Sequence, residues 1–303
     1  MKLVTFKNKN KNKNKEKIGV LSSDNRFIYA LNKINEKYFS MNELIINSNE
    51  LERKTWEEEI KDEEKVQFVG EKYNIREVKI LAPIPEPRQD VICLGINYLD
   101  HAKESAAFKK EAFDGKREKA VYFSKRVNEA VGHEGFIESH KDIVTDLDYE
   151  VELGVIIGRD AKGVSKEEAL DYVFGYTIIN DISARTLQNQ HKQWYFGKSL
   201  DGFLPMGPCI VTAEEIQNPH NLNISSRVNG ELRQRSNTSY LIFDVAFVIS
   251  ELSKGMTLKA GTIISMGTPA GVGMGFKPPR FLKSGDVVKC EIEGIGTLIN
   301  TVE

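Results

Sequence analysis

Cysteine is scarce in this chain of 303 residues. Its three cysteines, Cys93, Cys209 and Cys290, lie far apart, each in an apolar run. This spacing contains no disulfide framework and no paired-cysteine metal motif, so we predict small buried side chains in a protein from a reducing compartment. A chain of this length can bury a core large enough to need no covalent cross-links.

Long apolar runs and a basic excess are also missing. No apolar stretch reaches the roughly 18–20 residues of a membrane span, and MKLVTFKNKN at the N-terminus lacks the apolar centre of a signal peptide. The net charge of −2 argues against a nucleic-acid-binding protein. There is no phosphate-binding loop and no dinucleotide fingerprint. We therefore expect a cytoplasmic protein whose partner is a small molecule, not nucleic acid or a membrane.

The N-terminal quarter of the chain differs in texture from the rest. It carries the tract KNKNKNKNKEK at 7–17, which has nothing to bury and is predicted to be a solvated hairpin loop or a mobile segment. The prolines of APIPEPRQD, at 82–90, favour the extended backbone of a linker. We predict a small β-rich N-terminal domain at 1–78 and a larger domain at 79–303.

The larger domain is predicted to be mostly strand. DVICLGINY, VELGVIIG, VFGYTIIN and TIISMG are β-branched runs bounded by turn-forming residues. Helices are fewer: Ser165 and Glu168 form a capping-box pattern ahead of an apolar segment, and 239–255 has helical apolar spacing that ends at Gly255. The expected fold class is β-rich α+β.

The stretch DYEVELGVIIG, at 148–158, places two carboxylates in an apolar strand. Glu150 and Glu152 are two residues apart, so they project from one face, roughly 7 Å apart along the backbone. Facing carboxylates repel each other, and arginine, protonation or a divalent cation relieves the repulsion. The plain alternative is a pair that faces solvent or basic side chains.

Three further segments carry polar groups that suit a site. Asp181 ends an apolar strand, where it is placed for a cavity or as the N-cap of a following helix. Lys198 lies in a glycine-bounded loop, and the turn SMGTPAGVGMG at 265–275 offers amides to an anion. His101 and Glu104 are i, i+3 neighbours on a short predicted helix, so Glu104 can polarise the imidazole for proton transfer. The alternative for His101 is a surface or capping histidine.

Together these pieces resemble the fumarylacetoacetate hydrolase family. The matching segments occur in family order from about residue 91 onward: GINYLDHAKE, YFSK, DYEVELGVIIG, NDISARTLQ, GKSLDGFLPMGP, VNGELRQ and ISMGTPAGVG. The resemblance implies a mixed β-roll, usually a homodimer, that acts on small 2-oxo or diketo acids with a divalent metal. The N-terminal region looks like the small extra domain of longer members.

The resemblance also implies a role for each matching residue. Glu150, Glu152 and Asp181 would bind Mg²⁺ or Mn²⁺, with Ca²⁺ as a further option, because an all-carboxylate site suits hard cations. Asp100 matches an extra metal ligand of some members. His101, Glu104 and Lys198 would be catalytic. The implied substrate-binding residues are Lys125, Arg185 and Thr268.

Several reactions are compatible with these residues. The leading interpretation is hydrolysis of a C–C bond in acylpyruvate-like 2,4-diketo acids. The alternatives are an isomerase or decarboxylase of the hydroxymuconate type and an oxaloacetate decarboxylase or tautomerase, all of which form the same enolate. A module that binds metal and oxo acid without catalysis is a further alternative.

Overall fold

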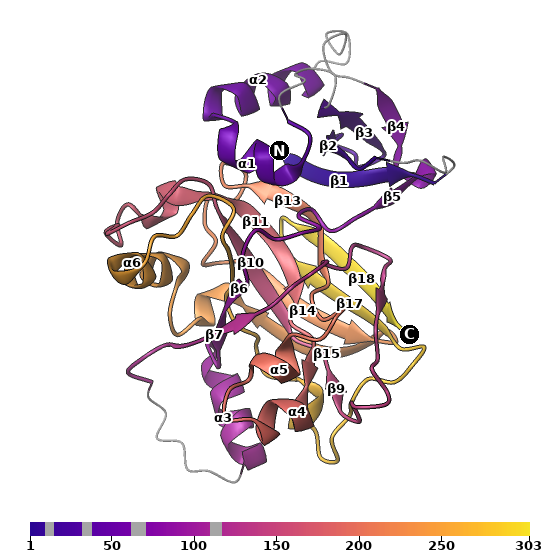
Figure 1. The fold of residues 1–303 in the computed structure, drawn as a ribbon, viewed down its shortest axis with the longest axis vertical. Coiled ribbons are helices and arrows are strands. Elements are labelled where there is room, and N and C mark those ends of the chain that lie inside the picture. Colours follow the sequence, from indigo (N-terminus) through magenta and orange to yellow (C-terminus); the bar gives the residue numbers. More distant parts are fainter. Residues whose placement is uncertain (10–14, 32–37, 62–70, 110–116) are drawn as a thin grey trace.

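The computed structural model describes residues 1–9, 15–31, 38–61, 71–109 and 117–303. One mixed sheet of eleven strands organises the chain, in the order β4-β3-β2-β1-β13-β11-β10-β16-β6-β7 with β5 paired to β1 (Figure 1). Its strands are β1 (Lys2–Asn8), β2 (Lys17–Leu21), β3 (Phe27–Ala30), β4 (Lys72–Asn74), β5 (Val78–Ile80), β6 (Val91–Gly95), β7 (Val121–Lys125), β10 (Val151–Ile157), β11 (Val173–Asn180), β13 (Met206–Thr212) and β16 (Ile263–Ser265).

Two smaller sheets and six α-helices complete the described fold. A five-stranded sheet has the order β15 (Glu231–Asn237), β14 (Asn223–Val228), β17 (Val287–Ile292), β18 (Gly296–Val302) and β8 (Phe136–Ile137), and β9 (Leu147–Asp148) pairs with β12 (Ser183–Ala184). The helices are α1 (Met41–Asn47), α2 (Glu50–Lys61), α3 (Leu99–Lys109), α4 (Arg185–Gln190), α5 (Tyr195–Lys198) and α6 (Val245–Gly255). Most strand pairs are antiparallel, and β16·β6 and β18·β8 are parallel. The β-rich α+β prediction is confirmed.

Strand β10 lies in the interior of the large sheet, between β11 and β16. All seven of its residues, VELGVII, are buried. Such a continuous apolar run is expected where both faces of a strand are covered. Glu152 is therefore buried because the strand that carries it is covered on both faces, although a carboxylate side chain is normally exposed.

The N-terminal strands continue the same sheet. Strand β1 pairs antiparallel with β13, with Lys2 opposite Val211 and Leu3 opposite Ile210. In Figure 1 the N-terminal elements lie at one end of the molecule, and α3, α4 and α5 lie at the other. The boundary at residue 78 stays a prediction. The Lys/Asn tract connects the antiparallel strands β1 and β2, and its residues 10–14 lie outside the described residues.

The predicted helices are found with two corrections. The helix expected over 239–255 begins only after Asp244, whose side chain accepts the amide of Phe247 at 2.7 Å, and it ends at Gly255 as predicted. Ser165 Oγ accepts the Glu168 amide at 3.3 Å, as in a capping box, and donates to Glu168 Oε2 at 2.8 Å. However, only the single 3-10 turn Ala169–Tyr172 follows them, because β11 begins at the next residue.

The described residues also bear on two expectations from composition. The three cysteines are buried and unpaired, as predicted. Within the described ranges, no helix is both long enough and apolar enough to cross a membrane.

Candidate metal centre

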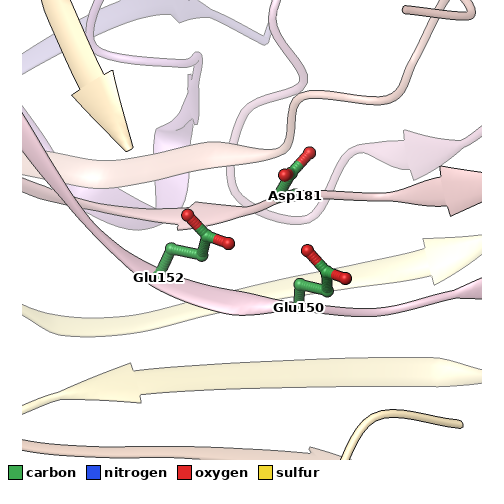
Figure 2. A group of neighbouring side chains, drawn as sticks. All are labelled: Glu150, Glu152 and Asp181. Atoms are coloured by element: carbon green, nitrogen blue, oxygen red, sulfur yellow. The ribbon is translucent and has the colours of Figure 1, made fainter. Parts of the chain in front are cut away.

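Three carboxylates converge where β10 and β11 lie side by side. Glu150 immediately precedes β10, Glu152 lies within it, and Asp181 immediately follows β11. The antiparallel pairing joins these ends, since the Asp181 amide donates to the Glu150 carbonyl at 2.8 Å. Figure 2 shows both glutamates on one segment of the chain and Asp181 on the segment beside it. One oxygen from each carboxylate lies within 4.8 Å of the others, and all three side chains are buried.

Two of the three carboxylates are neutralised by cations of the protein. Lys198 Nζ lies 2.7 Å from both Glu150 Oε2 and Asp181 Oδ2. Arg185 Nη2 lies 2.6 Å from Glu150 Oε1, and Lys125 Nζ lies 2.5 Å from Asp181 Oδ1. Burial alone would raise the pKa of Glu150, but Lys198 and Arg185 outweigh burial and lower it. Glu150 is therefore ionised in the folded protein.

Glu152 is different, because no cation neutralises it. Its Oε2 accepts from Ser265 Oγ at 2.6 Å and from the Gly267 amide at 2.7 Å. Among the described residues, no ion pair within 4 Å involves Glu152. Burial raises the pKa of Glu152 well above its usual value, and the charges of Asp181 and Glu150 raise it further. Glu152 is therefore the one carboxylate of the three that none of these cations contacts directly.

These residues fit a hard divalent cation. Three carboxylates each offer one oxygen to a common point, and such a set leaves octahedral positions for water or substrate. The uncompensated Glu152 would gain a cationic partner on binding. Lys198 already holds positive charge between the other two carboxylates. Mg²⁺ and Mn²⁺ suit this oxygen-only set better than zinc, which favours nitrogen and sulfur ligands.

Asp148 and Arg185 tie the glycine-rich turn to this centre. Arg185 Nε donates to Asp148 Oδ2 at 2.9 Å, while Nη2 contacts Glu150 and Nη1 donates to Gln188 at 3.1 Å. Asp148, which is fully buried, also accepts three backbone amides at 2.6–3.0 Å, those of Tyr149, Gly273 and Met274. Arg185 thus orients Glu150, and it also lines the cavity at the site. Sequence reasoning missed Asp148, although its position two residues before a buried glutamate was the available signal.

The His101–Glu104 pair faces the same site from α3. His101 Nδ1 lies 3.0 Å from Glu104 Oε2, and Glu104 Oε1 accepts the Gly271 amide at 2.9 Å. His101 is only 4% exposed, so it is not a surface histidine. A side chain at Gly275 would meet Glu104 Oε1 at 1.9 Å, so the turn needs glycine there to approach the pair. The Glu104 carboxylate is therefore fixed between the His101 ring and the Gly271 amide.

Two residues that were predicted to bind substrate donate hydrogen bonds to backbone carbonyls of the protein. Lys125 is fully buried and, besides contacting Asp181, donates to the carbonyls of Ile182 and Phe203 at 3.0 and 2.6 Å. This places Lys125 behind Asp181, where it fixes the carboxylate. Thr268 lines the cavity at the site, but its hydroxyl donates to the Val151 carbonyl at 2.9 Å.

Asp100 is not brought to the three carboxylates. Its side chain is 80% exposed and lies 3.3 Å from Lys103 Nζ. Consecutive helical residues point in directions about 100° apart, so the turn that buries His101 directs Asp100 outward. The structure therefore separates Asp100 from the candidate metal ligands that the sequence grouped with it.

A small cavity joins the carboxylates to the histidine. Its volume is about 30 Å³, and its polar wall includes Glu150, Glu152, His101 and Lys198. Leu94, Ile96, Phe123 and Trp194 form most of the apolar wall. Ile96 has φ of 56°, a strained value for a β-branched residue and one that is found most often at functional sites.

Comparison with known proteins agrees with this geometry. The family model described as fumarylacetoacetate (FAA) hydrolase C-terminal matches residues 90–303. Oxaloacetate tautomerase YisK of Bacillus subtilis (strain 168) is 50% identical over 230 residues, which are 76% of this chain and 75% of that protein.

Two solved structures resemble the whole chain. A fumarylacetoacetate hydrolase from psychrophilic Exiguobacterium antarcticum has a TM-score of 0.81 and 39% identity, covering 100% of this chain and 99% of its own. Maleylpyruvate hydrolase from Sphingobium sp. SYK-6, solved with manganese(II) and pyruvate, has a TM-score of 0.76 and 26% identity, covering 100% and 98%. The expected fold, a mixed β-roll, is shared with these proteins.

Proposed function

The chain belongs to the fumarylacetoacetate hydrolase family, and from that premise we propose a divalent-metal-dependent enzyme that interconverts the enol and keto forms of a small 2-oxo diacid. One observation carries the proposal: Glu150 and Glu152 of the carboxylate cluster line one small cavity together with His101, whose ring contacts Glu104. The similarity to an oxaloacetate tautomerase supports a diacid of the oxaloacetate kind as substrate.

The metal ligands in this proposal are Glu150, Glu152 and Asp181. A bound Mg²⁺ or Mn²⁺ supplies Lewis acidity, which stabilises negative charge on the enolate oxygen. The protein's own contribution is to orient the three carboxylates. Arg185 fixes Glu150, Lys125 fixes Asp181, and the Ser265 hydroxyl and Gly267 amide fix Glu152.

His101 is the proposed proton carrier. An ionised Glu104 can only accept, so its contact at 3.0 Å assigns the proton of the neutral ring to Nδ1. This leaves the Nε2 lone pair to take a proton from the carbon next to the substrate's carbonyl and to deliver it to the carbonyl oxygen, which gives the enol; the reverse transfer restores the keto form. Glu104 stabilises the imidazolium that forms in between. The amide of Gly271 keeps Glu104 in this orientation.

Lys198 is proposed to stabilise charge on the substrate. Its ammonium is 2% exposed and is shared between Glu150 and Asp181. A cation bound by these carboxylates would take over part of their charge, and the Lys198 ammonium would then donate to substrate oxygens. A fixed donor aimed at developing negative charge is worth more in such a buried site than in water.

C–C hydrolysis of a 2,4-diketo acid is the second candidate. The observation that favours it is the same His101–Glu104 pair, because an oriented imidazole can also deprotonate a water for attack on the distal carbonyl. The likeness to a maleylpyruvate hydrolase agrees with this reaction. Decarboxylation of oxaloacetate needs the same enolate and no attacking water.

The test compares substrates on one preparation. Chelated protein is assayed with and without Mg²⁺ or Mn²⁺ on oxaloacetate tautomerisation, acetylpyruvate hydrolysis and isomerisation of a hydroxymuconate. We expect metal-dependent tautomerisation to be the fastest, and we expect His101→Ala to remove it. Lys103→Gln, an exposed change on the same helix, is the matched control. Undiminished activity in excess chelator would contradict the metal's role. Binding of Mg²⁺ and oxalate without any turnover would favour a non-catalytic module.

A further inference from the structure

The cavity beside the carboxylates is narrow, with a volume of about 30 Å³. The side chains that line it therefore lie close to any substrate that enters, and they limit how long that substrate can be. These residues differ in how firmly the surrounding structure holds them.

Trp194 is the large side chain in the cavity wall with the least support from regular structure. Glu152 and Leu94 belong to buried strands, at 1% and 2% exposed. Trp194 instead lies at the end of the short connection between α4 and α5, and it is half-buried. The next two residues, Tyr195 and Phe196, are 42% and 44% exposed. Trp194 belongs to neither of the two buried hydrophobic clusters of the described residues.

Gly95 and the Trp194 indole fit each other closely. A Cβ built at Gly95 would lie 2.3 Å from Cζ3 and 2.7 Å from Cη2 of the indole. Gly95 is not among the glycines with positive φ, so its backbone does not require glycine. The absence of a side chain at Gly95 instead makes room for the ring. Phe123 supports the indole edge-on, with ring centroids 5.3 Å apart.

Trp194 lines the cavity in which the substrate would bind, so its indole would contact the substrate. Glu150, Glu152 and Lys198 line the cavity, and the 2-oxo acid head would bind to them under the proposed function. Trp194 and Phe123 form an apolar wall of the same cavity. The hydrocarbon part of the substrate therefore meets the indole, and each added methylene presses further against it.

We propose that Trp194 determines the chain length of the 2-oxo acids that this site accepts. With its indole against Gly95, the site favours short acids, and longer ones bind only when the ring is displaced. The inference rests on the proposed function, and it adds a specificity-determining residue to it.

The first experiment measures binding, which does not require turnover. Titrations with Mg²⁺ and the 2-oxo diacids of four, five and six carbons give a dissociation constant for each. A buried methylene favours binding by about fourfold, so Trp194→Ala should raise the six-carbon to four-carbon affinity ratio by about 15-fold. Trp194→Phe should give an intermediate ratio. Gly95→Ala, which pushes the indole away without removing it, should shift the ratio in the same direction.

The second experiment observes the ring itself. The chain has two tryptophans, and Trp56 is buried against Tyr38 in the N-terminal region. In a Trp56→Phe background, emission from Trp194 should shift to longer wavelength as the indole becomes exposed, and more so with the six-carbon acid than with oxalate. Trp56→Phe alone should leave the affinity series unchanged, and Trp194→Ala should leave Mg²⁺ affinity unchanged.

An unchanged affinity ratio in Trp194→Ala, or equal emission with short and long acids, would overturn the proposal. Binding without turnover would contradict the proposed function and leave the chain-length prediction standing. Failure of the wild type to bind any 2-oxo acid would overturn both.

Discussion

Substitution of glutamate by glutamine should have opposite effects on stability at Glu152, in β10, and at Glu150, which directly precedes that strand. Glu152→Gln removes a carboxylate that no cation neutralises, and Glu150→Gln removes one that Lys198 and Arg185 both contact. In the metal-free protein, the first change should stabilise the fold and the second should destabilise it. Both variants keep the size and shape of the side chain.

The magnitudes follow from the distances. Ligand oxygens within 4.8 Å of one another repel by about 3.5 kcal/mol per ionised pair at an effective dielectric constant near 20. Lys198 offsets part of this repulsion, so Glu152→Gln should stabilise by roughly 1–3 kcal/mol. Glu150→Gln leaves buried cations without their partner, a change that costs about 3–5 kcal/mol.

The effects should depend on pH in opposite ways. The pKa of Glu152 is raised in the fold, so the folded state keeps a proton that the unfolded chain loses above about 4.5. Wild-type stability therefore falls as pH rises from there toward the raised pKa, and Glu152→Gln removes that decline. The pKa of Glu150 is lowered, so its contribution is present above about 4.5 and is lost in acid. Glu150→Gln should thus be most damaging at neutral pH.

Urea unfolding in chelator between pH 5 and 8 measures both effects. Calorimetric titration with Mg²⁺ adds a second test, because Glu152 must lose its proton on binding a cation. We expect wild-type protein to release a proton and Glu152→Gln to bind Mg²⁺ weakly without that release. If Glu152→Gln were less stable than wild type across the range, the account of an uncompensated carboxylate would be refuted. Destabilisation of the same size in both variants would refute it equally.

Three further predictions concern the surroundings of the site. His101→Ala and Glu104→Gln should each lower kcat by about 10²–10⁴-fold while Mg²⁺ affinity stays within a few fold, and the double variant should be little worse than the worse single one; steady-state kinetics and titration check this. Asp181→Asn should weaken Mg²⁺ binding in calorimetry while circular dichroism shows an intact fold. Gly267→Ala should lower both the melting temperature and the Mg²⁺ affinity. Gly267 has φ of 91°, and an added Cβ would lie 2.7 Å from the Cβ of Asn97. The resulting shift would move the Gly267 amide, which donates to the Glu152 carboxylate.

Local patterns predicted much of this site. Spacing of two residues in a strand was enough to put Glu150 and Glu152 on one face, and spacing of three in a helix was enough to pair His101 with Glu104. The partners that neutralise charge were beyond such reasoning, because they come from distant segments. Lys198, for example, is separated from Glu150 by 48 positions.

Other departures from the local patterns have physical causes. The helical turn at Asp100 and His101 directs the two neighbouring side chains apart. The helix expected after Ser165 is cut to one turn because the strand that follows begins early. The pairing of β1 with β13 joins residues about two hundred positions apart, and no local pattern carries such a register.

That pairing has a bearing on how pieces of this chain would behave. Residues 90–303, the part that the family model matches, include β13 but not β1. Without β1, the outer edge of β13 would present unpaired amides and carbonyls at Ile210 and Val211, near the C-terminal end of the strand. An exposed apolar strand edge of this kind pairs with strands of other molecules, and this pairing leads to aggregation. The N-terminal region therefore covers the edge of β13 and keeps it from pairing with other molecules. A protein expressed without this region should self-associate.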